Sequence, residues 1–117
     1  MEDCRVIGDV LLVHLPREID HHSGERIQKS VDRQLRTKKI ARIVFDFSQT
    51  EFMDSAGIGI LLGRYKRMKE RGGDAAMYGV SARIARLLRI AGMDKLIRCC
   101  RDFEQARKEG RHGCISE

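Results

Sequence analysis

The sequence has little that would divide the chain or take it across a membrane. It contains one proline, Pro16, and neither a low-complexity stretch nor an internal repeat, so we predict a single compact domain over residues 1–117. It has no apolar run of the roughly 18 residues that a membrane span requires. Residues 1–4 also lack the basic and then apolar layout of a signal peptide. We therefore expect a cytoplasmic protein without a membrane partner.

The sequence is also poor in the patterns that bind metals. Its four cysteines form no metal-binding framework, because two are adjacent and two stand alone: Cys4, Cys99, Cys100 and Cys114. Since vicinal cysteines strain a mutual disulfide and a cytosolic compartment keeps thiols reduced, we interpret all four as reduced thiols. His21 and His22 are adjacent, so their side chains point in different directions, and no third ligand stands at a suitable spacing. We expect no metal and no cofactor.

Aromatic residues make up only 5% of the chain, whereas its basic residues give a formal net charge of +6. Such a charge suits a nucleic acid, a membrane surface or an acidic partner. The basic residues are scattered over several expected elements, however, and no interleaved set of aromatics is available to stack on bases. The sequence thus disfavours a nucleic-acid-binding module, and we interpret the surface from Arg64 to Arg71 as a solvated helix face.

Apolar spacing divides the chain into alternating strands and helices. Short apolar runs predict strands at residues 5–7, 10–15, 40–47, 75–78 and 96–99. Apolar residues three and four apart predict amphipathic helices at residues 23–35, 55–71 and 81–91, and a short helix from residue 102. The order ββαβαβαβα indicates crossover connections, hence an α/β fold with a mixed, mainly parallel sheet flanked by helices. We expect the tail from about residue 110 to fray.

Small polar residues and glycines mark the ends of these elements. Ser23 and Ser81 stand directly before apolar helical patterns, so we predict both as helix N-caps. Gly8 lies between the first two strands and permits a tight hairpin turn. Gly72 and Gly92 follow the last residues of two helical patterns, where glycine commonly ends a helix.

The segment Met53 to Gly59 combines a hydroxyl with a predicted helix start. Ser55 follows a buried strand at an edge of the sheet where functional loops lie, and backbone N–H groups at a helix N-terminus favour negative charge. A phosphate on Ser55 would add about −1.5 to −2 charges there. Asp54 would repel that phosphate, while the small residues that follow allow a partner to approach closely. From its chemistry alone, the same segment equally describes a plain helix cap.

Enzymatic interpretations of this segment fail. Asp54-Ser55-Ala56-Gly57 does not match the Gly-x-Ser-x-Gly nucleophile elbow, and the chain has no phosphate-binding Gly-x-x-x-x-Gly-Lys loop. Gly57-Ile58-Gly59 continues into an apolar run and is not a dinucleotide fingerprint. We therefore expect no catalytic residues and do not expect an enzyme.

Three stretches together resemble a known family. They are Glu18 to Ser23, Phe52 to Gly59, and Leu62 to Lys66. They resemble the STAS-domain anti-sigma-factor antagonists, most closely those of the sporulation sigma-F switch, and the similarity extends from about Val6 to Phe103. The expected order of elements agrees with the fold of that family. Two departures stand out, since Ala56 replaces a second hydroxyl of the family motif and Pro16-Arg17 replaces a common glycine.

The resemblance implies a phosphorylation switch. The unphosphorylated protein would bind an anti-sigma factor that is also a serine kinase and so release a sigma factor. The kinase would phosphorylate Ser55 and end binding, and a serine phosphatase would restore it. The partner-binding residues implied by the match are Asp20, His21, Asp54, Ala56, Gly57 and Ile58. The alternative is a STAS regulatory or scaffold module in another partner-switching pathway, such as a stress response.

Overall fold

The computed structural model describes residues 3–108. Its strands are β1 (Cys4–Ile7), β2 (Val10–His14), β3 (Glu18–Ile19), β4 (Arg42–Asp46), β5 (Phe52–Met53), β6 (Asp74–Tyr78) and β7 (Arg98–Cys100). Its helices are α1 (His21–Thr37), α2 (Ser55–Glu70), α3 (Ala82–Ile90), the short 3₁₀ turn η1 (Met93–Lys95) and α4 (Phe103–Lys108). The expected tail from residue 110 and Cys114 lie outside the described residues.

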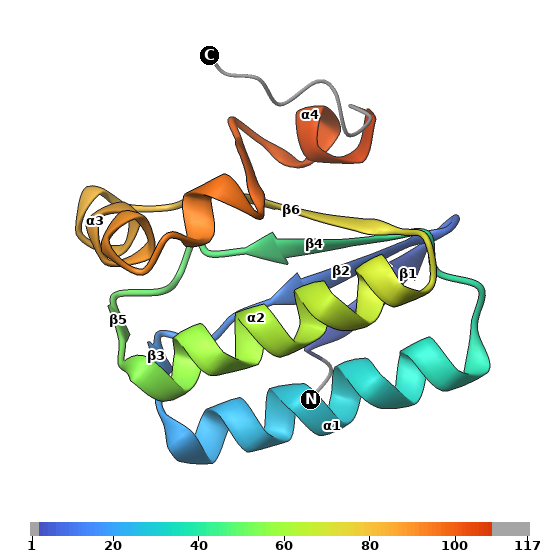
Figure 1. The fold of residues 1–117 in the computed structure, drawn as a ribbon, viewed down its shortest axis with the longest axis horizontal. Helices are drawn as coiled ribbons and strands as arrows, with labels where there is room; N and C mark the ends of the chain where they lie inside the picture. The colour runs from blue at the N-terminus through green and yellow to red at the C-terminus, as the bar shows by residue number, and fades with distance from the viewer. Residues whose placement is uncertain (1–2, 109–117) are drawn as a thin grey trace.

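The main sheet has five strands in the order β1-β2-β4-β6-β7. Strand β1 pairs with β2 in an antiparallel hairpin, and the other neighbours pair in parallel. Helices α1 and α2 cover one face of the sheet and α4 the other (Figure 1). Side chains alternate accordingly, with Leu11 and Ile43 in the core under α1 and α2, and Leu12 and Val44 in the core under α4. The predicted mixed, mainly parallel α/β sheet is confirmed.

Several predicted boundaries agree with the structure. Gly8 has a φ of +64° in the turn between β1 and β2, a conformation that glycine adopts without strain. The Ser81 hydroxyl accepts a hydrogen bond of 3.2 Å from the Ile84 N–H at the start of α3, so the predicted cap is present. The last strand begins at Arg98 rather than at residue 96, because η1 continues the chain in a helical turn after α3.

The predicted N-cap of α1 was wrong. The helix begins at His21, and Asp20 is its N-cap with φ −117° and ψ −170°. Ser23 instead occupies the third helical position and closes a capping box with Asp20. In the sequence, Ser23 looks like the start of the helix because the first residue of the apolar stripe, Ile27, follows it by about one turn.

The predicted solvated face of α2 was wrong at Arg64. This side chain is buried, with a residue exposure of 5%, and its Nε lies 3.2 Å from the Asp32 carboxylate of α1. Arg67 lies 3.8 Å from the same carboxylate but is half exposed. Burial lowers the pKa of Arg64, and the Asp32 charge opposes that shift. The pair therefore ties α1 to α2 within an otherwise apolar contact.

The described residues can be compared with the expectations about membrane spans, metal sites and cysteines. No helix within residues 3–108 is both long and apolar enough to cross a membrane. Over the same residues, no group of three or more His, Cys, Asp or Glu side chains is placed to hold a metal ion. Cys4 and Cys100 are buried and Cys99 is exposed.

Candidate functional site

A small two-stranded sheet, not predicted from the sequence, brings the candidate site residues close to one another. Strand β3 pairs in parallel with β5, with Ile19 opposite Met53. Each strand has only two residues, too few to show a period in the sequence. Because both strands lead directly into helices, the pairing puts Asp20 at the start of α1 beside Asp54 at the start of α2, and the Asp54 N–H donates to the Ile19 carbonyl at 3.2 Å.

The loops before β3 and β5 are also tied to each other. The Thr50 hydroxyl donates to the Pro16 carbonyl at 2.9 Å, and the Glu51 N–H donates to the Arg17 carbonyl at 2.8 Å. The Arg17 and Glu51 side chains form an exposed ion pair at 3.0 Å. Pro16-Arg17, which departs from the family pattern, therefore still supports the pairing of β3 with β5 through its backbone carbonyls.

Ser55 is the first residue of α2 and is exposed. Its hydroxyl makes no hydrogen bond to any residue in the described range 3–108. The Asp54 carboxylate turns toward the helix and accepts hydrogen bonds from the Ala56 and Gly57 N–H groups at 2.9 and 3.4 Å. Asp54 thus occupies two of the N–H groups that would otherwise attract an anion, so a phosphate on Ser55 would have to point toward solvent.

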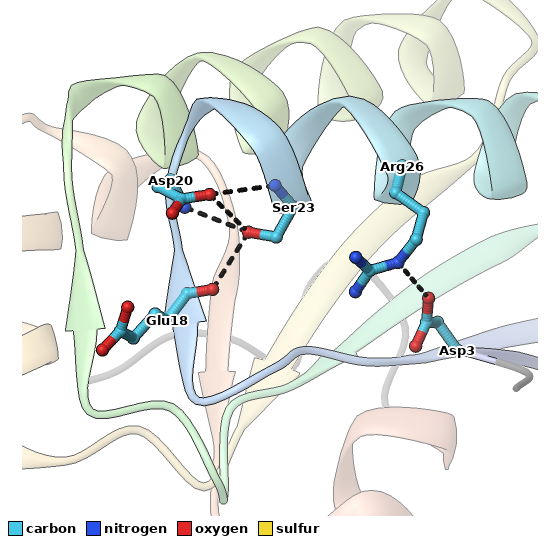
Figure 2. A network of polar contacts seen from close by, with 5 residues as sticks. All are labelled: Asp3, Glu18, Asp20, Ser23 and Arg26. Carbon is cyan, nitrogen blue, oxygen red and sulfur yellow. Dashed lines mark hydrogen bonds and ion pairs between the residues drawn. The ribbon is translucent and has the colours of Figure 1, made fainter.

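Asp20 is held by a denser set of hydrogen bonds, drawn in Figure 2. The Ser23 N–H donates to the Asp20 carboxylate at 2.9 Å, and the Asp20 N–H donates to the Ser23 hydroxyl oxygen at 3.0 Å. The Ser23 hydroxyl lies 2.9 Å from the Glu18 carbonyl. The Ser23 N–H lowers the pKa of the Asp20 carboxyl, so Asp20 remains a fixed negative charge beside the start of α2.

A groove of about 320 Å³ lies between the N-terminal parts of α1 and α2, and on α2 its lining begins at Ala56, the residue after Ser55. Its lining residues are His21, Gly24, Glu25, Gln28, Ala56, Gly59 and Ile60. The helices approach closely because Gly24 has no side chain, and a Cβ there would lie 3.1 Å from Ile60 Cγ1. A Cβ on Gly59, in contrast, would have no neighbour within 4 Å, so this position is open.

A second polar cluster supports the same end of the main sheet. His14 and Asp46, at the ends of β2 and β4, are joined by a contact of 2.8 Å. The Ser48 N–H donates to Asp46 at 2.9 Å. Burial by itself would raise the pKa of Asp46, but hydrogen bonds from Ser48, His14 and Tyr78 outweigh it and lower the pKa. Burial and the Asp46 charge raise the pKa of Tyr78 to about 12. The cluster braces three strand ends without reaching Ser55.

The structure gathers the predicted site residues in one region but gives them different roles. His21 is exposed, whereas Ala56 is half-buried in the groove lining. Gly57 is buried against Met53 and Ile19, so its role is to let β5 and α2 approach closely. Ile58 is partly buried and packs on the main core.

The groove residues of α1 were not predicted from the sequence. These are Gly24, Glu25 and Gln28. The only signal for them was the glycine inside a predicted helix, which indicates a close approach of another backbone or side chain.

Comparison with known proteins decides the family. A model described as the STAS domain matches residues 3–106. The chain belongs to the STAS domain family. An anti-sigma F factor antagonist of Paenibacillus polymyxa is 35% identical over 88 residues, which cover 75% of this chain and 75% of the relative. An anti-sigma-B factor antagonist of Listeria monocytogenes is 27% identical over 90 residues, covering 76% of this chain and 77% of the relative.

Solved structures share this STAS fold. The anti-sigma factor antagonist SpoIIAA in its unphosphorylated form has a TM-score of 0.80 and 22% identity, covering 97% of each chain. Its phosphorylated form, from Bacillus, has a TM-score of 0.72 and 22% identity, covering 89% of this chain and 94% of the other. The resemblance seen in the sequence and the expected fold are confirmed. The named relatives are regulatory proteins, and the prediction that this chain is not an enzyme is likewise confirmed.

Proposed function

We propose that this STAS domain is an anti-sigma-factor antagonist whose binding is switched by phosphorylation of Ser55. The observation that carries the proposal is the state of the Ser55 hydroxyl, which is exposed and has no hydrogen-bond partner within residues 3–108. The fold does not need this hydroxyl, so it is available to a kinase. The relatives' names, which describe antagonists of anti-sigma factors, support the proposal.

The charge around Ser55 supplies the switch. Asp20 and Asp54 are the N-caps of the neighbouring helices α1 and α2, and Glu25 lines the groove. A phosphate would add about −1.5 to −2 charges beside these carboxylates. Because Asp54 occupies the nearest helix N–H groups, the fold offers the phosphate no compensating site, and the phosphate would stay in the contact surface. A bound partner would then meet a bulky, strongly solvated group, and binding would weaken without a change of fold.

The groove between α1 and α2 would receive part of the partner. In its unphosphorylated form the protein would bind a cytoplasmic anti-sigma factor that is also a serine kinase, and so release the sigma factor. A serine phosphatase would remove the phosphate and restore binding. The contact residues that we propose are Asp20, His21, Asp54 and Ala56, with Gly57 and Ile58 shaping the surface beneath them.

A second candidate is a STAS regulatory or scaffold module in a stress-response pathway. The relatives include antagonists of two different anti-sigma factors, one named for sigma F and one for sigma B, so membership of the family does not fix the pathway. Ser55 and the groove would have the same roles in both candidates, which differ in the partner that the unphosphorylated protein binds. The partner that binds the unphosphorylated protein decides between them.

The test is to incubate the protein with each purified anti-sigma factor kinase of the source organism and ATP. We expect phosphate on Ser55 by peptide mass mapping and none on Ser55→Ala. We expect Ser55→Glu to lower the affinity for the same kinase by about 100-fold or more, equal to about 2.8 kcal/mol. Ser30→Glu serves as the control, because Ser30 lies in the middle of α1, outside the groove lining and away from both helix starts. Phosphate at another residue, or unchanged binding of Ser55→Glu, would refute the proposal.

A further inference from the structure

Helix α3 has a second apolar face that the fold does not use. Ile84 and Leu88 are buried in the main core. Leu87 is 37% exposed and Ile90 is 75% exposed, the highest value among the exposed large hydrophobic residues of the described chain. Isolated exposed apolar residues are normal, but these two lie three apart and therefore share one side of the helix.

Arginines border this apolar pair. Arg83 and Arg86 precede Leu87 and Ile90 at helical spacings, so all four share one exposed face, and Arg89 flanks it. None of the three arginines pairs with a carboxylate within residues 3–108. We call this face, made of Arg83, Arg86, Leu87, Arg89 and Ile90, the α3 face.

The α3 face lies at the same end of the molecule as Ser55. Strands β2 and β4 point their carboxyl ends toward the edge where α1 and α2 begin, and α3 lies at that edge (Figure 1). The topology requires this, because β6 runs parallel to β4 and α3 follows β6 directly. Strand β5 lies at the same edge, and its residue Phe52 is 48% exposed. The edge therefore carries the Ser55 site, an exposed aromatic side chain and the α3 face.

The two ends of this edge differ in charge. The groove beside Ser55 is lined by Glu25 and contains neither lysine nor arginine, and Asp20 and Asp54 lie next to it. The α3 face carries three arginines around its apolar pair and no acidic residue. Protein partners that meet such a surface present complementary charges, which set orientation and increase the association rate.

We infer that the α3 face is a second docking surface for the anti-sigma factor kinase. It would bind a surface patch of the kinase that has acidic residues around an apolar centre. The inference rests on the proposed function. With a basic region of the partner facing Asp20 and Asp54 and an acidic region facing α3, only one orientation brings Ser55 to the kinase active site. An anionic bilayer presents charge of one sign only, so it would attract the α3 face and repel the Ser55 end. A protein partner therefore fits the whole edge better than a membrane does.

The test compares two triple variants with the same change in charge. One is Arg83→Gln/Arg86→Gln/Arg89→Gln on α3, and the other is Lys29→Gln/Arg33→Gln/Arg36→Gln, on exposed positions of α1. Association with the kinase that phosphorylates Ser55 is measured at several salt concentrations. We expect the α3 variant to associate about tenfold more slowly at low salt and with a weaker salt dependence, and the α1 variant to remain close to wild type.

The apolar part is tested with Leu87→Ser/Ile90→Ser, which we expect to dissociate about tenfold faster. All variants are compared with the wild type by thermal unfolding, and each should fold, since the changed side chains are exposed. Wild-type rates for both α3 variants would overturn the inference while leaving the proposed function intact. So would α3-dependent binding to phosphatidylserine vesicles with unchanged kinase binding. If the wild-type protein neither binds a kinase nor accepts phosphate, the proposed function fails, and the inference fails with it.

Discussion

Helices α1 and α2 start side by side in nearly the same way, yet only one start carries a serine that is available for modification. Asp20 and Asp54 are both N-caps, with similar backbone angles, and each follows a strand of the same small sheet. At α1 the serine is the third helical residue, and its hydroxyl belongs to the capping box. At α2 the serine is the first helical residue, and its hydroxyl makes no hydrogen bond within residues 3–108.

The difference shows how position alone assigns a serine to the fold or to a partner. In α1 the hydroxyl of Ser23 is needed, because it satisfies the Asp20 N–H. In α2 the third position is Gly57, which has no side chain, and the Ala56 and Gly57 N–H groups donate to the Asp54 carboxylate without help from a serine hydroxyl. The hydroxyl of Ser55 therefore remains available for phosphorylation at the surface.

Two glycines near the start of α2, Gly57 at the third helical position and Gly59 at the fifth, should respond in opposite ways to added bulk. A Cβ on Gly57 would collide with the Met53 side chain and lie 3.0 Å from Ile19 Cγ2. We expect Gly57→Ala to destabilise the protein by about 1–3 kcal/mol through overpacking, measured by urea unfolding. Gly59→Ala is the control two residues later, where the space is open, and we expect it to stabilise the helix by up to about 1 kcal/mol. Equal effects of the two substitutions on the free energy of unfolding would show that β5 does not pack closely against α2 at Gly57.

The groove beside Ser55 should be required for binding but not for folding. Gly59→Leu places a side chain in the groove, whereas Gly63→Leu places the same side chain one turn later, outside the groove and also in open space. We expect both variants to keep wild-type stability or exceed it. Only Gly59→Leu should lower the affinity for the kinase, by about tenfold or more, measured by titration calorimetry. A similar loss with Gly63→Leu would place the partner farther along α2 than we propose.

The paired serines should separate stability from regulation. Ser23→Ala removes the capping-box hydroxyl, and we expect a loss of about 1 kcal/mol in the free energy of unfolding. Ser55→Ala removes a hydroxyl without a partner, and we expect a change within about 0.5 kcal/mol. Phosphorylation by the kinase should show the reverse pattern, being retained in Ser23→Ala and lost in Ser55→Ala. A destabilising Ser55→Ala would mean that the fold uses Ser55 after all.

The sequence predicted the elements with a clear period and missed what depends on contacts between distant segments. The long strands and helices, and Ser55 at a helix start, followed from apolar spacing. Strands β3 and β5 did not, because their stability comes from pairing with each other rather than from a pattern in either. The cap at Asp20 was missed because Ser23 is an equally suitable capping residue by type.

The burial of Arg64 also depends on a contact between distant segments and was therefore not predicted from the sequence. It lies three residues after Leu61 and four before Met68, which are both buried, so its position in the apolar stripe was visible in the sequence. Its burial depends on Asp32, which lies on another helix and offers a charge in the contact. Residue type suggested solvent exposure, and only the packing of α1 on α2 reveals the pair.

The negative charge of Asp20, the N-cap of α1, should have only a small effect on the stability of the fold. The Ser23 N–H holds the pKa of Asp20 below its unfolded value, so the charged cap stabilises the folded state above that value, and the contribution is lost as pH falls through the folded pKa. Asp20→Asn keeps a capping side chain that does not titrate. We expect the stability difference between wild type and Asp20→Asn to be constant from neutral pH to about pH 5 and to shrink below about pH 4. Urea unfolding across this range measures it, and the effect should be small because solvent screens an exposed carboxylate. A difference that does not vary with pH would show that the α1 cap acts by hydrogen bonding alone, whatever the charge on Asp20.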